Sequence, residues 1–124
     1  MIYDSSTYSV FVYSQQLIPY TTVITNIGGH YNPDTYTFVC PYRGVYVFTV
    51  STNAYNDQLV GELYKNDQLL IRTFANEDFR DSATASVVTE CEMRDSVYVY
   101  AYTGGEFDCY WSPAHFSGYL LHKY

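Results

Sequence analysis

The chain consists of short runs in which aromatic or β-branched residues alternate with other residues. A repeat of two residues is typical of β-strands, and no amphipathic helical stripe of useful length accompanies it. The predicted strands cover residues 8–14, 21–25, 35–40, 45–52, 59–65, 68–74, 84–92, 96–103 and 116–122. The pattern therefore predicts an all-β chain with nine or ten short strands.

Turn residues separate these runs. Clusters rich in Asn, Asp, Gly, Pro and Ser stand at 26–29, 41–44, 53–57, 66–67, 76–81, 94–95, 104–105 and 112–113. Turn signals at intervals of roughly 8 to 15 residues are typical of a β-sandwich or barrel. Because 124 residues leave room for one hydrophobic core, we predict a single domain over residues 1–124.

The strand at residues 45–50 is apolar on both faces. One face carries Val45, Val47 and Thr49, and the other carries Tyr46, Phe48 and Val50. A strand of this kind is typical of the centre of a sheet with material packed on each side. We therefore expect a second chain to cover the face that the core of one chain leaves open.

The strand at residues 96–102 has two different faces. Small aliphatic residues suit the inner face, and the other face carries a row of tyrosines, Tyr98, Tyr100 and Tyr102. Two interpretations of this row stay open. It serves cross-strand packing or a subunit contact, or it forms a ligand platform, because each tyrosine offers a flat ring and a hydroxyl.

Composition supports the strands and excludes several kinds of partner. Sixteen Tyr, seven Phe and one Trp make 19% of the chain aromatic, as half-buried pleated surfaces favour. A net charge of −7 argues against nucleic acid and anionic membranes, whose binding needs clustered cations. No apolar stretch is long enough for a membrane helix, so we expect no membrane insertion.

Few residues suggest chemistry. The three histidines are isolated in sequence, and no nucleophile elbow or phosphate loop is present, so we predict no enzyme. The most polar loop spans residues 75–82 and includes Asp78 and Asp81. Its carboxylates could bind calcium, which prefers oxygen ligands, or could simply be solvated, and on its own terms the sequence favours the solvated loop.

Several motifs together resemble one family. Residues 26–48 read NIGGHYNPDTYTFVCPYRGVYVF, residues 60–67 VGELYKND, residues 95–99 DSVYV and residues 116–121 FSGYLL. These runs resemble the signature of the globular C1q domain over essentially the whole chain. Two positions depart from it, since Tyr36 and Arg94 stand where the family usually has glycine.

The resemblance implies a ten-stranded jelly-roll sandwich of the C1q and tumour necrosis factor type that is secreted and assembles as a homotrimer. The trimer would form around the first, last and Gly-x-Tyr-x-Phe strands, with Tyr46, Phe48 and Phe116 in its core. Some relatives bind calcium in the loop that holds Asp81, which matches one acidic ligand position, and we expect Asp78 as a second ligand.

The function that the resemblance implies is non-enzymatic recognition. We expect a lectin-like module of innate immunity that binds carbohydrate or microbial surface ligands through Tyr98, Tyr100 and Tyr102. The alternative is a signalling ligand of the C1q and tumour necrosis factor type that engages a receptor protein.

The three cysteines are an odd number, so at least one thiol is free or pairs with another chain. The implied topology puts Cys40 and Cys91 at one end of the sandwich and Cys109 at the other. A bridge from Cys91 to Cys109 would have to cross a strand of about seven residues, roughly 23 Å. We therefore expect no disulfide between these two.

Overall fold

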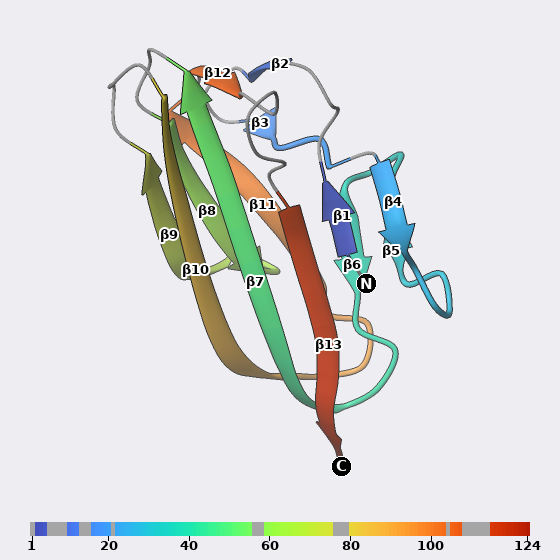
Figure 1. The fold of residues 1–124 in the computed structure, drawn as a ribbon. Coiled ribbons are helices and arrows are strands. Elements are labelled where there is room, and N and C mark those ends of the chain that lie inside the picture. The colour runs from blue at the N-terminus through green and yellow to red at the C-terminus, as the bar shows by residue number, and fades with distance from the viewer. Residues whose placement is uncertain are drawn as a thin grey trace.

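The chain folds as two packed antiparallel β-sheets (Figure 1). The computed structural model describes residues 2–4, 10–12, 16–20, 22–55, 59–75, 80–103, 105–107 and 115–124, and within them it has strands and no helix. The strands are β1 (Ile2–Asp4), β2 (Val10–Val12), β3 (Gln16–Leu17), β4 (Thr22–Thr25), β5 (Tyr31–Asn32), β6 (Thr37–Val39), β7 (Gly44–Tyr55), β8 (Leu59–Lys65), β9 (Gln68–Ala75), β10 (Arg80–Cys91), β11 (Ser96–Thr103), β12 (Gly105–Phe107) and β13 (His115–Lys123).

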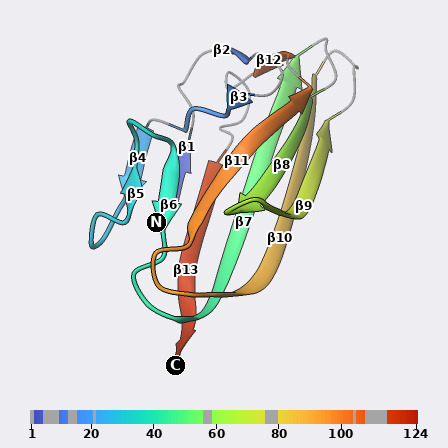
Figure 2. The ribbon, with the colours of Figure 1, turned by 180° about the vertical axis from the view of Figure 1, so that it is seen from behind.

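The two layers are easily told apart. Sheet A has seven strands in the order β2, β12, β7, β13, β1, β4, with β10 also paired to β7. Sheet B has six strands in the order β5, β6, β11, β8, β9, with β3 also paired to β11. Figure 2 shows β11 of sheet B in front of β7 and β13 of sheet A. The first strand, the last strand and the strand that follows Gly44 thus lie side by side in one sheet.

The predicted all-β fold class is confirmed, and every predicted strand has a counterpart. Strands β8 and β11 have the predicted bounds. The number of strands is higher than predicted because four short strands of two or three residues also pair in the sheets, namely β1, β3, β5 and β12. Strand β10 begins at Arg80 rather than at residue 84, so the polar stretch before Thr84 belongs partly to a strand.

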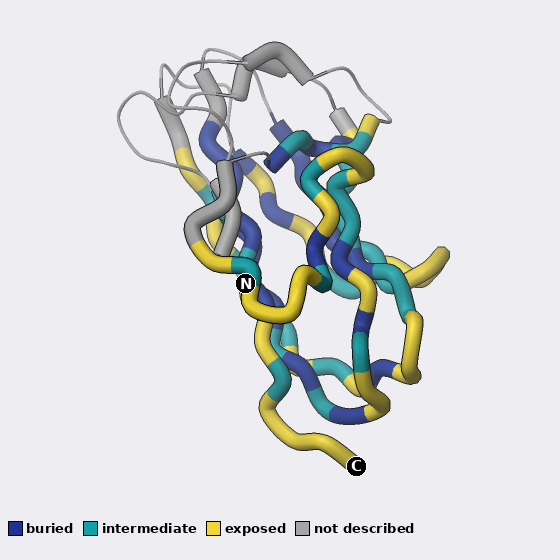
Figure 3. Tube along the Cα trace, turned by 90° about the vertical axis from the view of Figure 1, so that its right-hand side faces the viewer, coloured by how far each residue is buried: buried dark blue, intermediate teal, exposed yellow. Residues whose placement is uncertain are grey.

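The core lies between the sheets, where each strand turns every second side chain inward. Strand β7 contributes Tyr46, Phe48 and Val50. Strand β11 contributes the small aliphatic residues of its predicted inner face, Val97, Val99 and Ala101. Figure 3 shows the resulting alternation of buried and less buried positions along the strands.

Aromatic rings fill the centre of this core. The ring of Phe48 lies 5.5 Å from that of Phe38 on β6, which links the two sheets, and 6.2 Å from that of Phe116 on β13. The buried tyrosines keep their hydroxyls hydrogen-bonded, as burial requires. Tyr31 donates to the carbonyl of Tyr20 at 2.9 Å, and Tyr46 donates to the carbonyl of Tyr42 at 2.7 Å.

The residues expected in the trimer core, Tyr46, Phe48 and Phe116, belong to the core of a single chain. Their exposed fractions within one chain are 1%, 0% and 0%, so they need no second chain to cover them. The sequence was ambiguous because both faces of residues 45–50 are apolar. The larger aromatic residues face inward, and the opposite face of the strand, which includes Val47, is the one directed away from the core.

The two positions that depart from the family signature both have a left-handed backbone. Tyr36 has φ of 60° and Arg94 has φ of 73°. In this region a Cβ atom crowds the following carbonyl, at a cost of roughly 1–2 kcal/mol, whereas glycine is unstrained. The fold therefore keeps turn geometries that suit glycine at positions where this chain has larger residues.

Replacing Phe48 by alanine should lower the free energy of unfolding by about 3 to 5 kcal/mol, because it removes a fully buried ring from the core. Urea denaturation at a fixed protomer concentration measures the change. The matched control is Val39→Ala on β6 of sheet B, whose side chain is 40% exposed and whose loss should cost under about 1 kcal/mol. Equal effects of the two substitutions would contradict this core.

Replacing Arg94 by glycine should raise the stability by about 0.5 to 1 kcal/mol. The strain of the left-handed side chain is relieved, and the greater freedom of glycine in the unfolded chain offsets part of the gain. Met93→Gly, next to it and without a positive φ, should instead destabilise the protein. Thermal unfolding compares the two variants, and a loss of stability in Arg94→Gly would refute the strain.

Candidate functional site

A groove of about 550 Å³ lies on the face of sheet B that points away from the core. Its central strand is β11, which β8 flanks on one side and β3 and β6 flank on the other. Figure 2 shows this sheet in front. The groove is lined by Leu17, Thr37, Tyr64, Asp67, Ser96, Tyr98 and Tyr100.

Three tyrosines form the aromatic wall of the groove. Antiparallel pairing places Tyr98 opposite Tyr64, and their rings stack at 5.8 Å with an angle of 10° between planes. The ring of Tyr100 meets that of Tyr64 edge to face, at 5.9 Å and 82°. The groove thus presents aromatic surfaces in two nearly perpendicular orientations.

A turn at Asn66 holds this wall in place. Asn66 has φ of 53°, its side-chain amide donates to Asp95 Oδ1 at 3.0 Å, and its Oδ1 accepts from the Ser96 amide at 3.0 Å. The Tyr98 hydroxyl donates to the Asn66 carbonyl. The β8–β9 turn, which also carries Asp67, is therefore tied to the start of β11.

A buried carboxylate lies behind the tyrosines. Glu62 on β8 is 2% exposed, and its Oε2 accepts from Arg72 Nε at 2.6 Å. Its Oε1 accepts from the Tyr64 hydroxyl at 3.3 Å. The hydrogen bond to Glu62 raises the pKa of Arg72, and desolvation together with Glu62 raises the pKa of Tyr64. The ion pair with Arg72 therefore compensates the charge of the buried Glu62 carboxylate.

The predicted tyrosine row divides between two settings. Tyr98 and Tyr100 line the groove, whereas Tyr102 is not among its lining residues. The guanidinium of Arg72 lies 5.6 Å from the centre of the Tyr102 ring. Tyr64, rather than Tyr102, is the third tyrosine of the groove. The sequence places Tyr64 in a predicted strand but does not show that it pairs with Tyr98.

The described lining of the groove carries a negative charge. Among the described residues that line it, Asp67 is the one carboxylate, and no Lys, Arg or His is among them. Burial and then Asp67 raise the pKa of the Tyr98 hydroxyl. The Tyr98 hydroxyl already donates to the Asn66 carbonyl, so its ring face is the part of Tyr98 that is open to a ligand.

Of the two predicted calcium ligands, the structure describes the backbone of one. Asp78 is outside the described residues, and Asp81 belongs to β10, where its backbone pairs with Ala54. Among the described residues no group of three His, Cys, Asp or Glu side chains could hold a metal ion. These residues also contain no helix long and apolar enough to cross a membrane.

The cysteines Cys40 and Cys91 meet at one end of the sandwich. Both are buried free thiols. Their mutual hydrogen bond, together with burial, raises the pKa of the Cys40 thiol. Cys109 lies outside the described residues, so the expectation about its pairing with Cys91 stays a prediction.

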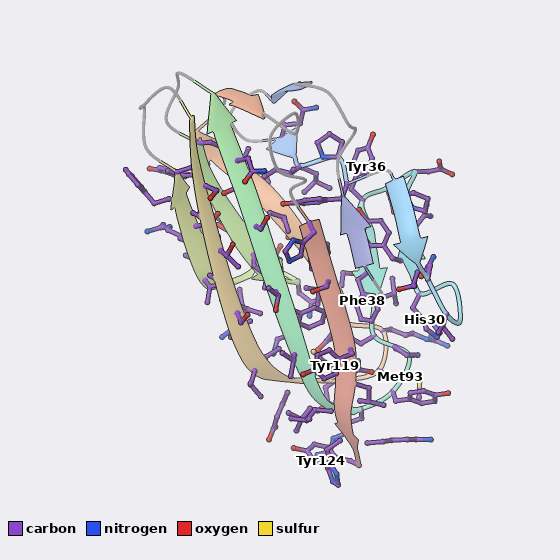
Figure 4. All side chains as sticks on the ribbon, in the orientation of Figure 1. His30, Tyr36, Phe38, Met93, Tyr119 and Tyr124 are labelled. Atoms are coloured by element: carbon purple, nitrogen blue, oxygen red, sulfur yellow. The ribbon has the colours of Figure 1, made fainter. Side chains whose placement is uncertain are left out.

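The outward face of sheet A carries a second surface, here called the sheet A row. Val88 on β10 and Tyr119 on β13 both stand opposite Val47 on β7. Val88 is 62% exposed and Tyr119 is 57% exposed, and Figure 4 shows Tyr119 on β13. Beside this row, Thr49 and Ser86 share a hydrogen bond of 2.8 Å.

The chain is similar in sequence to known proteins. It is 34% identical over 130 residues to human complement C1q tumor necrosis factor-related protein 2, covering 97% of the chain and 46% of that protein. The mouse complement C1q tumor necrosis factor-related protein 7 is 32% identical over 117 residues, covering 89% of the chain and 40% of that protein. The chain thus spans less than half the length of these relatives.

Solved structures share the fold. The globular domain of zebrafish complement 1qA aligns with a TM-score of 0.75 and 16% identity, covering 94% of the chain and 98% of that domain. Eiger TNF from S. frugiperda aligns with a TM-score of 0.79 and 11% identity, covering 99% of the chain and 91% of that structure. A family model described as the C1q domain matches residues 4–121. With the motifs, the strand order and this match in agreement, the chain belongs to the C1q domain family.

Proposed function

We propose that the protein is a secreted, trimeric, non-enzymatic recognition module that binds carbohydrate on microbial surfaces and serves innate immunity. The observation that carries the proposal is the aromatic wall of the groove, in which the ring of Tyr64 contacts those of Tyr98 and Tyr100. A sugar ring offers a flat face of C–H groups that packs against an aromatic ring, and hydroxyls that need partners.

The groove supplies both kinds of contact. Thr37 and Ser96 add hydroxyls beside the tyrosine rings, and Leu17 adds an apolar edge. The volume of about 550 Å³ lies in the range of small-molecule sites. Because the groove is on the outward face of sheet B, a polymer chain could lie along it without entering the protein.

The sheet A row is the surface through which we expect the trimer to assemble. Exposed apolar side chains at Val88 and Tyr119, with the half-buried Val47 between them, form a surface that a second copy would cover. Sheet B faces the opposite way, so each copy would keep its groove open. Three grooves on one particle would convert weak single-site binding into useful avidity on a repetitive surface.

A second candidate function is a signalling ligand that engages a receptor protein. Curated relatives of the chain bear the name tumor necrosis factor-related protein, and Eiger TNF shares its fold. A pull-down from host membranes that recovers one receptor, together with absence of sugar binding, would favour this candidate over the first.

Calcium stays a prediction of the family resemblance. Of the two expected ligands, Asp81 is the second residue of β10. If calcium supports binding, the affinity of Asp81→Asn for immobilised glycans in the presence of calcium should equal that of the wild type in the presence of chelator.

The protein should behave in solution as a homotrimer, with about three times the monomer mass of 14.3 kDa in light scattering. Val47→Glu should shift it to monomer, because it puts a charge in the centre of the sheet A row. The control is Val39→Glu, which puts the same charge on β6 of sheet B and should leave the trimer intact. A monodisperse monomer at micromolar concentration would refute the assembly.

Tyr100→Ala should weaken binding to immobilised glycans roughly three- to tenfold per site, because it removes one surface of the aromatic wall. Tyr102→Ala, which alters the same strand outside the groove, should change binding less. A glycan array and titration with and without chelator provide the measurement. Equal binding by wild type and Tyr100→Ala, with both proteins trimeric, would place the ligand surface elsewhere.

A further inference from the structure

The charge of the groove points to a narrower class of sugar. We propose that the groove selects saccharides that carry a protonated amine, which the Asp67 carboxylate and the faces of the tyrosine rings bind together. This inference rests on the proposed function and names the ligand class of the same site.

Asp67 is the carboxylate in this region that is open to a ligand. The neighbouring acids are already engaged, since Glu62 pairs with Arg72 and Asp95 accepts hydrogen bonds from Asn66 and from the Glu92 amide. Within the described part of the chain, no Lys or Arg forms an ion pair with Asp67. The exposed turn therefore presents an unneutralised negative charge at the edge of the groove.

Nearby cations are committed elsewhere. Lys65, two residues before Asp67, donates from Nζ to the carbonyl of Glu90 at 2.8 Å. Arg72 is held between Glu62 and the ring of Tyr102. A cation from the ligand would thus meet Asp67 without displacing an internal partner.

The tyrosine rings add a second attraction for a cation. Aromatic rings are negative on their faces and attract ammonium groups within about 6 Å, more strongly where water is excluded. The rings of Tyr64 and Tyr100 are nearly perpendicular, so they form two walls of a corner. The neighbouring Tyr102 already carries such a contact with Arg72.

The same field disfavours anionic sugars. Asp67 puts a negative charge beside the tyrosine wall, among the residues that line the groove. The lining residues that the structure describes include no cation to receive a sulfate, phosphate or carboxylate. A ligand with uncharged or acidic units would bind through ring stacking alone or be repelled.

Two matched oligosaccharides test this selection. Chitin and chitosan oligomers of equal length share the same linkage and ring, and they differ in whether the 2-amino group is acetylated and neutral or free and protonated at pH 6. Isothermal titration of the wild-type trimer should give tighter binding for the chitosan oligomer, about fivefold or more. Raising the salt concentration should reduce the difference.

Asp67→Asn should weaken chitosan binding about two- to fivefold and change chitin binding less, since it removes the charge and keeps the size of the side chain. Asp34→Asn, a second exposed acid in a turn outside the groove, is the control and should change neither. Tyr100→Ala should weaken both oligomers.

The outcomes separate the inference from the function on which it rests. Equal affinity for both oligomers, or tighter binding of chitin, overturns the amine selection while leaving the sugar site in place. Binding of neither oligomer overturns both. Chitosan binding that survives Tyr100→Ala, or that falls as much in Asp34→Asn as in Asp67→Asn, reflects general attraction to an acidic protein and also overturns the selection.

Discussion

The packing of the aromatic residues of β7 against β6 and β13 constrains everything else in this domain. Side chains alternate along a strand, so placing Phe48 in the core fixes the direction of every other residue of β7. Val47 must then face outward, and through the ladders with β10 and β13 so must Val88 and Tyr119. The burial of this cluster of rings thus determines which face of sheet A is accessible to another molecule.

The same alternation gives the tyrosines two different roles. Tyrosines such as Tyr31 and Tyr46 lie inside, where each hydroxyl finds a backbone carbonyl. Tyr64, Tyr98 and Tyr100 lie on the outside of sheet B, where the rings of Tyr98 and Tyr100 both contact that of Tyr64. A chain with sixteen tyrosines therefore uses them both as core residues with a polar tip and as a surface with the chemistry of a binding site.

Much of the fold could be predicted because the turn residues are clear. Asn66 and Asp67, and then Arg94 and Asp95, flank β8 and β11, whose bounds agree with the prediction. The start of β10 was missed because its first residues are polar and resemble a loop. The inward face of β7 could not be chosen because alternation identifies two faces but not which one is buried when both are apolar.

The groove could be predicted only in part, since it depends on which strands are neighbours. Tyr98 and Tyr100 follow from the alternation of one strand, whereas Tyr64 joins them through the register of β8 with β11. Asp67 reaches the groove through the turn after β8. Neither fact is contained in the local pattern of any single strand.

The anchoring of the β8–β9 turn has a consequence for the kinetics of recognition. The Asn66 hydrogen bonds and the stacking of Tyr98 on Tyr64 hold the site before any ligand arrives. A ligand would then lose little free energy to ordering of the protein, and the site would be ready at first encounter. In the proposed role of sugar binding, differences in affinity should consequently arise in how long each sugar stays bound rather than in how fast it arrives.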